Sequence, residues 1–126
     1  MIVWDKQSMA LGVGWRAQHE IIMFATQGGA AFDKHNGHGN VINCPRTRKE
    51  YHPTEKPVKL LSQLISTSTW CREIYDPFAG SGSTILAAEQ TGRLCWAMEL
   101  DPGYVAAAIE RFYRATGDWP VCINRT

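Results

Sequence analysis

The chain has 126 residues, of which 44% are hydrophobic, and its formal net charge is +1. A chain of this length buries about two thirds of its unfolded surface, which is enough for one compact domain. The near-neutral charge excludes a strong overall electrostatic field, so any attraction to nucleic acid must come from a local patch.

Cysteine usage and the amino terminus predict a soluble, cytoplasmic protein. The four cysteines occur singly, without Cys-x-x-Cys spacing, which is typical of a reducing compartment. The first residues lack the basic segment and the apolar core of a signal peptide, and no apolar run approaches membrane-spanning length. We therefore expect a single domain over residues 1–126, with no contact to a membrane.

The first half of the chain is expected to supply two strands, a loop and a helix. Residues 2–4 are typical of a very short strand, and residues 19–26 of a buried strand, because their apolar residues are nearly continuous. The first strand has no flank before it, which suggests that some chain is missing there. Residues 27–51 are polar and rich in glycine, which predicts a flexible surface loop. Thr54 is placed to cap the amphipathic helix that follows it.

The second half alternates strands and helices. We expect a strand at 73–75, a helix at 83–90, a buried strand at 94–100 and a helix that Pro102 opens. This order is a βαβα unit, which requires a parallel strand pair joined by a right-handed crossover. The fold class is therefore α/β.

The ends of these two strands carry residues that point to a ligand. The turn Asp76-Pro-Phe-Ala-Gly-Ser-Gly82 follows the first strand, and Glu99-Leu-Asp-Pro follows the second. Ligands of parallel sheets bind at such carboxyl ends. A phosphate-binding loop would need a lysine that neither this turn nor its helix contains, so that interpretation fails. A dinucleotide fingerprint would need a small residue where Ile85 stands. Only Gly80-Ser81-Gly82 then supports a dinucleotide ligand, and that support is weak.

A third candidate ligand, S-adenosylmethionine, carries no phosphate. Gly80 and Gly82 would let the backbone approach its methionine moiety, while Asp76 would face its ammonium group. Glu99 is placed to accept hydrogen bonds from both ribose hydroxyls, each contributing on the order of 1.5 to 3 kcal/mol. Each feature alone can be a simple connector or a helix-capping turn, but together they predict a nucleoside site.

The motifs around these turns resemble those of the amino-methylating DNA methyltransferases. They are similar to the cofactor-binding motifs of that family and, upstream, to the motifs of its circularly permuted branch. The resemblance covers residues 1 to about 115. The stretches that carry it are Trp4-Asp-Lys6, Arg16-Ala-Gln-His-Glu20, His52-Pro-Thr-Glu-Lys-Pro57, Asp76-Pro-Phe-Ala-Gly-Ser-Gly-Ser-Thr84, Gly92-Arg93 and Glu99-Leu-Asp-Pro-Gly-Tyr104-Val105.

The resemblance implies a fold, a cofactor and a substrate. The fold is a Rossmann-like methyltransferase sheet of three layers, present in part as the βαβα unit plus the upstream strands. The cofactor is S-adenosylmethionine, and the substrate of the full-length enzyme is double-stranded DNA. The implied cofactor pocket is lined by Thr54, Lys56, Asp76, Phe78, Gly80, Ser81, Gly82, Glu99 and Leu100.

The sequence departs from the family at its catalytic motif. The family methylates the exocyclic amino nitrogen of a flipped adenine or cytosine with an Asp, Asn or Ser followed by Pro-Pro and an aromatic residue. All six prolines of this chain are isolated, so we assign no catalytic residue. In the permuted order that motif precedes the region matching residues 1–26. We therefore expect the carboxyl-terminal part of a catalytic domain, inactive alone.

Two completions of the sheet and one alternative function stay open. Another polypeptide could supply the missing half, or the chain could self-associate through an open sheet edge. The alternative function is a non-catalytic module that binds S-adenosylmethionine or oligomerises.

Other candidate sites have weaker support. His35, His38 and Cys44 have a spacing that three zinc ligands could use, but a polar loop is favoured and no metal site is predicted. The basic run Arg46, Arg48 and Lys49 could touch phosphates or simply be solvated. We expect Lys6 to be a surface charge, and Trp15 and Trp70 to serve in packing.

Overall fold

The computed structural model describes residues 1–27, 37–47, 55–68 and 71–121. None of the helices in these ranges combines the length and the apolar character that a membrane span requires. The described residues form five strands and three helices. In chain order these are β1 (Ile2–Asp5), β2 (His19–Ile22), β3 (Val41–Asn43), α1 (Val58–Ser66), β4 (Glu73–Asp76), α2 (Ser83–Gln90), β5 (Leu94–Ala97) and α3 (Pro102–Thr116).

The first sheet has the order β2-β1-β3, with β1 antiparallel to β2 and parallel to β3. Trp4 lies opposite Ile42 in the register, and both are buried together with Cys44 and Leu60. The indole Nε1 of Trp4 donates a 2.7 Å hydrogen bond to the backbone oxygen of Cys44. This bond satisfies the polar atom of a buried tryptophan, so the side chain can anchor the sheet in the core.

Strand β3 lies inside the segment 27–51 that the sequence predicts as a loop. The prediction is wrong for its three residues, because Ile42 is buried against β1 and α1. A strand of three residues offers one inward side chain, so periodicity could not reveal it. Residues 28–36 and 48–51 of the predicted loop lie outside the described residues.

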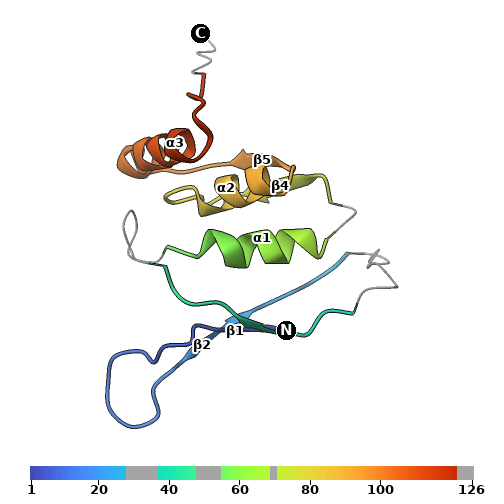
Figure 1. Cartoon of the computed structure of the whole chain (residues 1–126), viewed down its shortest axis with the longest axis vertical. Coiled ribbons are helices and arrows are strands. Elements are labelled where there is room, and N and C mark those ends of the chain that lie inside the picture. Colours follow the sequence, from blue (N-terminus) through green and yellow to red (C-terminus); the bar gives the residue numbers. More distant parts are fainter. Residues whose placement is uncertain (28–36, 48–54, 69–70, 122–126) are drawn as a thin grey trace.

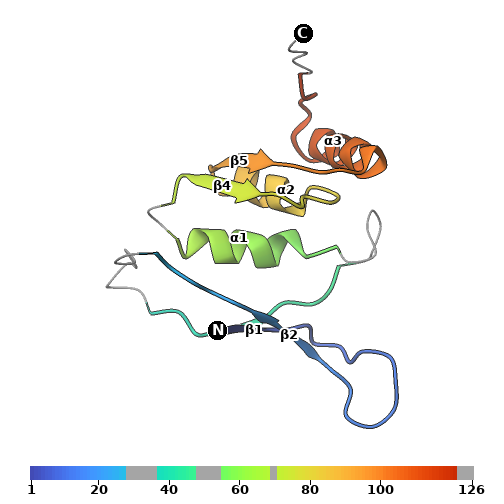
Figure 2. The ribbon, with the colours of Figure 1, turned by 180° about the vertical axis from the view of Figure 1, so that it is seen from behind.

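Helix α1 lies between α2 and the three-stranded sheet in both views (Figures 1 and 2). Leu60 on one face is buried against that sheet, with Leu64 packed beside it. The N-cap is Pro57, which makes no side-chain hydrogen bond, so the helix begins later than a cap at Thr54 would place it. Thr54 itself lies outside the described residues.

The expected βαβα unit is confirmed. Strands β4 and β5 pair in parallel, with Tyr75 opposite Trp96, and α2 joins them. The strand β5 ends at Ala97, three residues before the expected end. The backbone amide of Ala79 donates a 2.9 Å hydrogen bond to the backbone oxygen of Met98. The glycine turn is therefore bonded to the chain just after β5, beyond the last paired residues of the two strands.

Helix α3 begins and ends as the sequence predicts. The carboxylate of Asp101 accepts hydrogen bonds from the backbone amides of Gly103 at 2.7 Å and Tyr104 at 3.3 Å. Pro102 occupies the first turn, where its missing N–H costs nothing. Gly117 ends the helix in the left-handed conformation, with φ +84°.

The expectation of fully buried strands at 19–26 and 94–100 is wrong for one face of each sheet. In β2 the side chains alternate between exposed and partly buried, and in β5 only Cys95 is partly buried. The large exposed apolar side chains on these strands, on their partners and just beyond the strand ends are Ile21, Met23, Val41, Tyr75, Leu94, Trp96 and Met98.

Candidate functional site

A cavity of about 680 Å³ opens at the carboxyl ends of β4 and β5. Its size lies within the range of roughly 300 to 1,000 Å³ that is usual for small-molecule sites. Most predicted site residues of the described ranges line it: Lys56, Asp76, Phe78, Gly80, Ser81, Glu99 and Leu100. Thr54 lies outside the described residues. The sequence therefore located the two turns that form the cavity, and the structure brings them together.

Glu99 joins the two turns directly. Its Oε2 accepts a 2.7 Å hydrogen bond from the backbone amide of Gly80. Its Oε1 accepts hydrogen bonds of 2.9 Å from the amides of Leu100 and Asp101. Because backbone amides on both sides hold this carboxylate, its orientation at the cavity wall is fixed in advance.

Asp76 and Phe78 form the cavity wall at the end of β4. The Oδ1 atom of Asp76 accepts a 3.0 Å hydrogen bond from the backbone amide of Phe78, which closes a local turn. Phe78, which follows in this turn, is 87% exposed and lines the cavity. An exposed aromatic ring beside a fixed carboxylate is suited to contact a ligand rather than the core.

Gly82 serves a purpose that the sequence did not indicate. It lies outside the lining of the cavity, at the N-cap of α2 with φ +79°. A Cβ atom at this position would stand 2.9 Å from the Cβ of Ala108 in α3. The missing side chain thus lets α3 pack directly against the turn.

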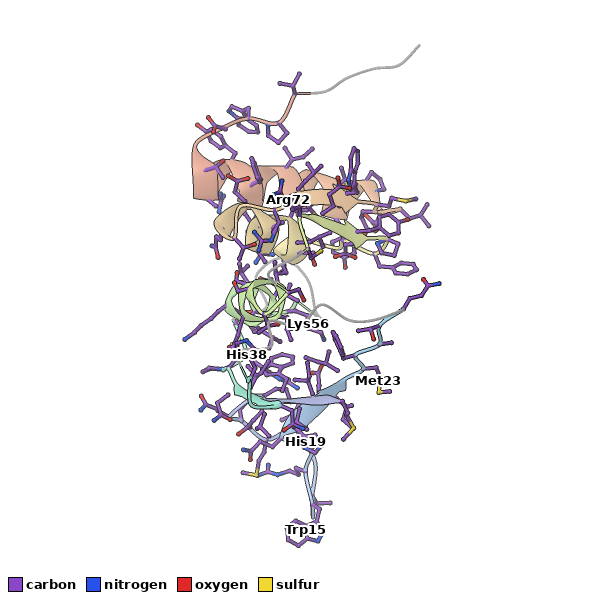
Figure 3. The ribbon with its side chains drawn as sticks, turned by 90° about the vertical axis from the view of Figure 1, so that its right-hand side faces the viewer. Trp15, His19, Met23, His38, Lys56 and Arg72 are labelled. Carbon is purple, nitrogen blue, oxygen red and sulfur yellow. The ribbon has the colours of Figure 1, made fainter. Side chains whose placement is uncertain are left out.

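Lys56 reaches the cavity from the segment before α1, and it also takes part in a cluster of charges. Its Nζ lies 3.0 Å from Oε2 of Glu20, whose other oxygen lies 3.6 Å from Nζ of Lys6 and 3.9 Å from Arg46. The Lys56 ammonium also stands 5.7 Å from the ring centre of Trp4. In side view the residue lies between α1 and the three-stranded sheet (Figure 3).

The charge cluster lowers the pKa of Glu20. Partial burial raises this pKa, but the hydrogen bond and charge of Lys56, together with the charge of Lys6, outweigh that effect. The expectation that Lys6 is a surface charge is wrong, because the residue is only 3% exposed. Glu20 supplies the counter-charge that a buried ammonium requires.

Arg111 and Glu55 are functional candidates that sequence reasoning missed. The guanidinium Nη2 of Arg111 lies 2.7 Å from Oε1 of Glu55, and both side chains are nearly buried. Glu55 lines the cavity together with Ser81 and Ser83, to which Arg111 also donates hydrogen bonds. Glu55 stands beside Lys56 in the stretch His52-Pro-Thr-Glu-Lys-Pro57, which was a usable signal, whereas Arg111 lies beyond the last stretch that carries the family resemblance.

The weaker candidates gain nothing from the structure. Among the described residues, no group of three metal-ligating side chains occurs. Cys44 is buried in the core, and Arg46 pairs with Glu20. Trp15 does not serve in packing, because it is fully exposed at the tip of the loop between β1 and β2 (Figure 3). His38 is exposed, and the other candidates lie outside the described ranges: His35, Arg48, Lys49 and Trp70.

Comparison with known proteins decides the family. The profile of the N6/N4 DNA methylase family, described as DNA methylase, matches residues 1–110. The chain belongs to this family. The resemblance to amino-methylating DNA methyltransferases is thereby confirmed.

Relatives in bacteria agree with this assignment. The chain is 39% identical over 105 residues to YubD of Escherichia coli strain K12, which is named as a methylase. It is 38% identical over 79 residues to the DNA adenine methyltransferase YhdJ of the same strain. These matches cover 82% and 58% of this chain, but 45% and 27% of the relatives. The chain therefore spans less than half the length of either relative.

Solved structures confirm the α/β methyltransferase fold. The complex of M1.HpyAVI with S-adenosylmethionine matches with a TM-score of 0.73 and 27% identity, over 87% of this chain and 59% of that one. The cytosine-N4-specific PvuII DNA methyltransferase matches with a TM-score of 0.53 and 29% identity. This match covers 60% of this chain and 32% of the PvuII enzyme chain.

Proposed function

We propose that this chain is the S-adenosylmethionine-binding part of an amino-methylating DNA methyltransferase and that residues 1–126 form one domain. The observation that carries the proposal is the 2.7 Å hydrogen bond from Gly80 to Glu99, which joins the two strand ends at the wall of one cavity. Further support comes from the solved relative that was crystallised with S-adenosylmethionine.

Residues of the cavity have separate tasks in this proposal. Glu99 accepts hydrogen bonds from the ribose hydroxyls. The same carboxylate oxygens also accept hydrogen bonds from the backbone amides that already orient this side chain. Asp76 faces the ammonium group, and Lys56 with Gly80 and Ser81 contacts the methionine end. Phe78 and Leu100, which are 87% and 97% exposed, cover apolar parts of the ligand. The cofactor, when bound, supplies an electrophilic methyl group, and the chain binds and orients it.

In this proposal the chain has no methyltransferase activity on DNA by itself. No Pro-Pro pair occurs in its sequence, so it lacks the carbonyl and side-chain acceptors that the family's catalytic motif offers to the target amino group. Activity would require a further segment that supplies this motif, whether in the same protein or in a partner. Double-stranded DNA is the proposed substrate of that whole enzyme.

A second candidate function is a non-catalytic, oligomerising module. The observation in its favour is the exposed apolar face of the sheets, where Tyr75, Trp96 and Met98 are each more than half exposed. Contiguous apolar surface of this kind marks interaction sites. A second copy of the chain or a missing half of the enzyme would cover it equally well.

Calorimetric titration with S-adenosylhomocysteine tests the proposed binding. We expect saturable heat for the purified chain and an affinity at least about tenfold lower for Glu99→Ala, because charged hydrogen bonds of about 1.5 to 3 kcal/mol are lost. Glu89→Ala, an exposed glutamate away from the cavity, is the matched control and should bind as the parent does. Absence of heat at millimolar ligand would contradict the proposal.

A methylation assay with labelled S-adenosylmethionine and double-stranded DNA separates the two candidate functions. The chain alone should transfer no label. Incorporation by the purified chain would overturn the proposed inactivity. Incorporation that appears only after a polypeptide with a Pro-Pro motif is added would favour an incomplete enzyme over the oligomerising module.

A further inference from the structure

Arg111 of α3 holds together two segments that lie far apart in the sequence. Its Nη2 atom lies 2.7 Å from Oε1 of Glu55, in the segment before α1. Its Nη1 atom donates hydrogen bonds to the backbone oxygen of Ser81 at 3.1 Å and to the hydroxyls of Ser81 and Ser83 at 3.0 Å. The glycine turn and the segment that carries Lys56 are thus fastened to one guanidinium group.

This network stands behind the cavity. Glu55, Ser81 and Ser83 line the cavity, whereas Arg111 is absent from its lining. The side chains of Arg111 and Glu55 are 11% and 4% exposed, so water screens their interaction weakly. Arg111 can therefore act on a ligand only through the residues that it holds.

The geometry requires an arginine. One nitrogen of its planar guanidinium serves Glu55 while another serves the turn, and both are fixed in a single plane. A lysine has one terminal nitrogen and could serve only one of the two segments well. The close packing of Gly82 on Ala108, one helical turn from Arg111, gives the turn a second support from the same helix.

We infer that Arg111 is a positioning residue, which sets the conformation of the glycine turn and of the Glu55–Lys56 segment for ligand binding. The inference rests on the proposed function, since the ligand it serves is S-adenosylmethionine. It goes further by assigning the organisation of that site to a residue of α3 that does not itself line the cavity. The bound ligand would find the Gly80 and Ser81 backbone already in place, so little order would have to be created on binding.

The test uses Arg111→Lys in the full chain, which keeps the positive charge beside buried Glu55 and so avoids leaving that carboxylate unpaired. We expect the dissociation constant for S-adenosylhomocysteine to rise about tenfold, because charged hydrogen bonds to the turn are lost. Arg114→Lys is the matched control: it lies on the same helix and pairs with Glu110 at 2.6 Å, with both side chains more than half exposed. Its affinity should equal that of the parent.

A second readout needs no ligand. Amide hydrogen exchange at residues 80–83 should accelerate in Arg111→Lys and stay unchanged in Arg114→Lys, while exchange in β1 stays constant in both. The double variant Arg111→Met with Glu55→Gln removes both charges without leaving one buried, and it should show the same acceleration. Wild-type affinity and wild-type exchange in Arg111→Lys would overturn the inference. If the parent chain binds no ligand but Arg111→Lys accelerates exchange, the proposed function fails and the positioning role stands.

Discussion

The carboxylate of Glu20 forms ion pairs with three cations that come from different segments. Lys6 follows β1, Arg46 follows β3 and Lys56 precedes α1, and each has a nitrogen within 4.0 Å of the Glu20 carboxylate. The pairs differ in exposure, since the Lys6 side chain is 4% exposed and that of Lys56 is 45% exposed. The buried member depends most on Glu20, because a buried ammonium without a counter-charge is costly.

We expect Glu20→Gln to lower the free energy of unfolding by about 1 kcal/mol at neutral pH, a small value because solvent screens the exposed pairs. The folded-state pKa of Glu20 lies below its ordinary value of 4.5, so its contribution is present above pH 4.5 and is lost as pH falls through the folded value. Urea unfolding at neutral pH and in acid should show the difference from the parent shrinking below pH 4.5. Glu110→Gln, at an exposed pair, should change little. A difference that persists or grows in acid would contradict this account.

The glycine turn and α3 pack against each other at close range. Gly82 combines a left-handed φ of +79° with a position at which any Cβ would collide with Ala108. Gly92, at the end of α2, has a similar φ of +64°, but a Cβ atom there would meet no other atom within 4 Å. Substituting alanine at each glycine therefore distinguishes the cost of backbone strain, which both positions share, from the cost of steric contact, which only Gly82 has.

Gly82→Ala should cost about 2 to 3 kcal/mol of unfolding free energy, from left-handed strain of about 1 kcal/mol plus overpacking against α3. Gly92→Ala should cost about 1 kcal/mol, from the strain alone. Urea unfolding of both variants measures the difference, and Gly82→Ala with Ala108→Gly should recover part of it. Equal losses for the two glycines would refute the proposed contact with α3.

Sequence reasoning predicted the elements with strong local signals and missed those that depend on distant partners. Helix α3 has an aspartate cap, an opening proline and a closing glycine, so its ends could be predicted. The strand Val41–Asn43 has one buried side chain, whose partner Trp4 lies far away in the sequence. The same reason explains why Arg111 was missed, since its partners belong to other segments. Glu99 and Gly80, which line the cavity, could be singled out from the sequence because each stands in a turn motif.

The whole molecule has helices on one face of its sheets and apolar side chains on the other. Parallel strands are normally covered on both faces, and here Leu94 and Trp96 are more than half exposed. The chain also spans 59% of the length of the solved M1.HpyAVI chain that it matches. The exposed apolar face is the observation that supports the second candidate function proposed above.

The central claim is that one cavity between the ends of β4 and β5 binds S-adenosylmethionine. Backbone amide chemical shifts of the isotopically labelled chain, followed during titration with S-adenosylhomocysteine, test it most directly. We predict that the largest saturable shifts fall on Gly80, Ser81 and Leu100, with none in β1. Shifts that are absent, or that fall on the exposed sheet face instead, would contradict the claim.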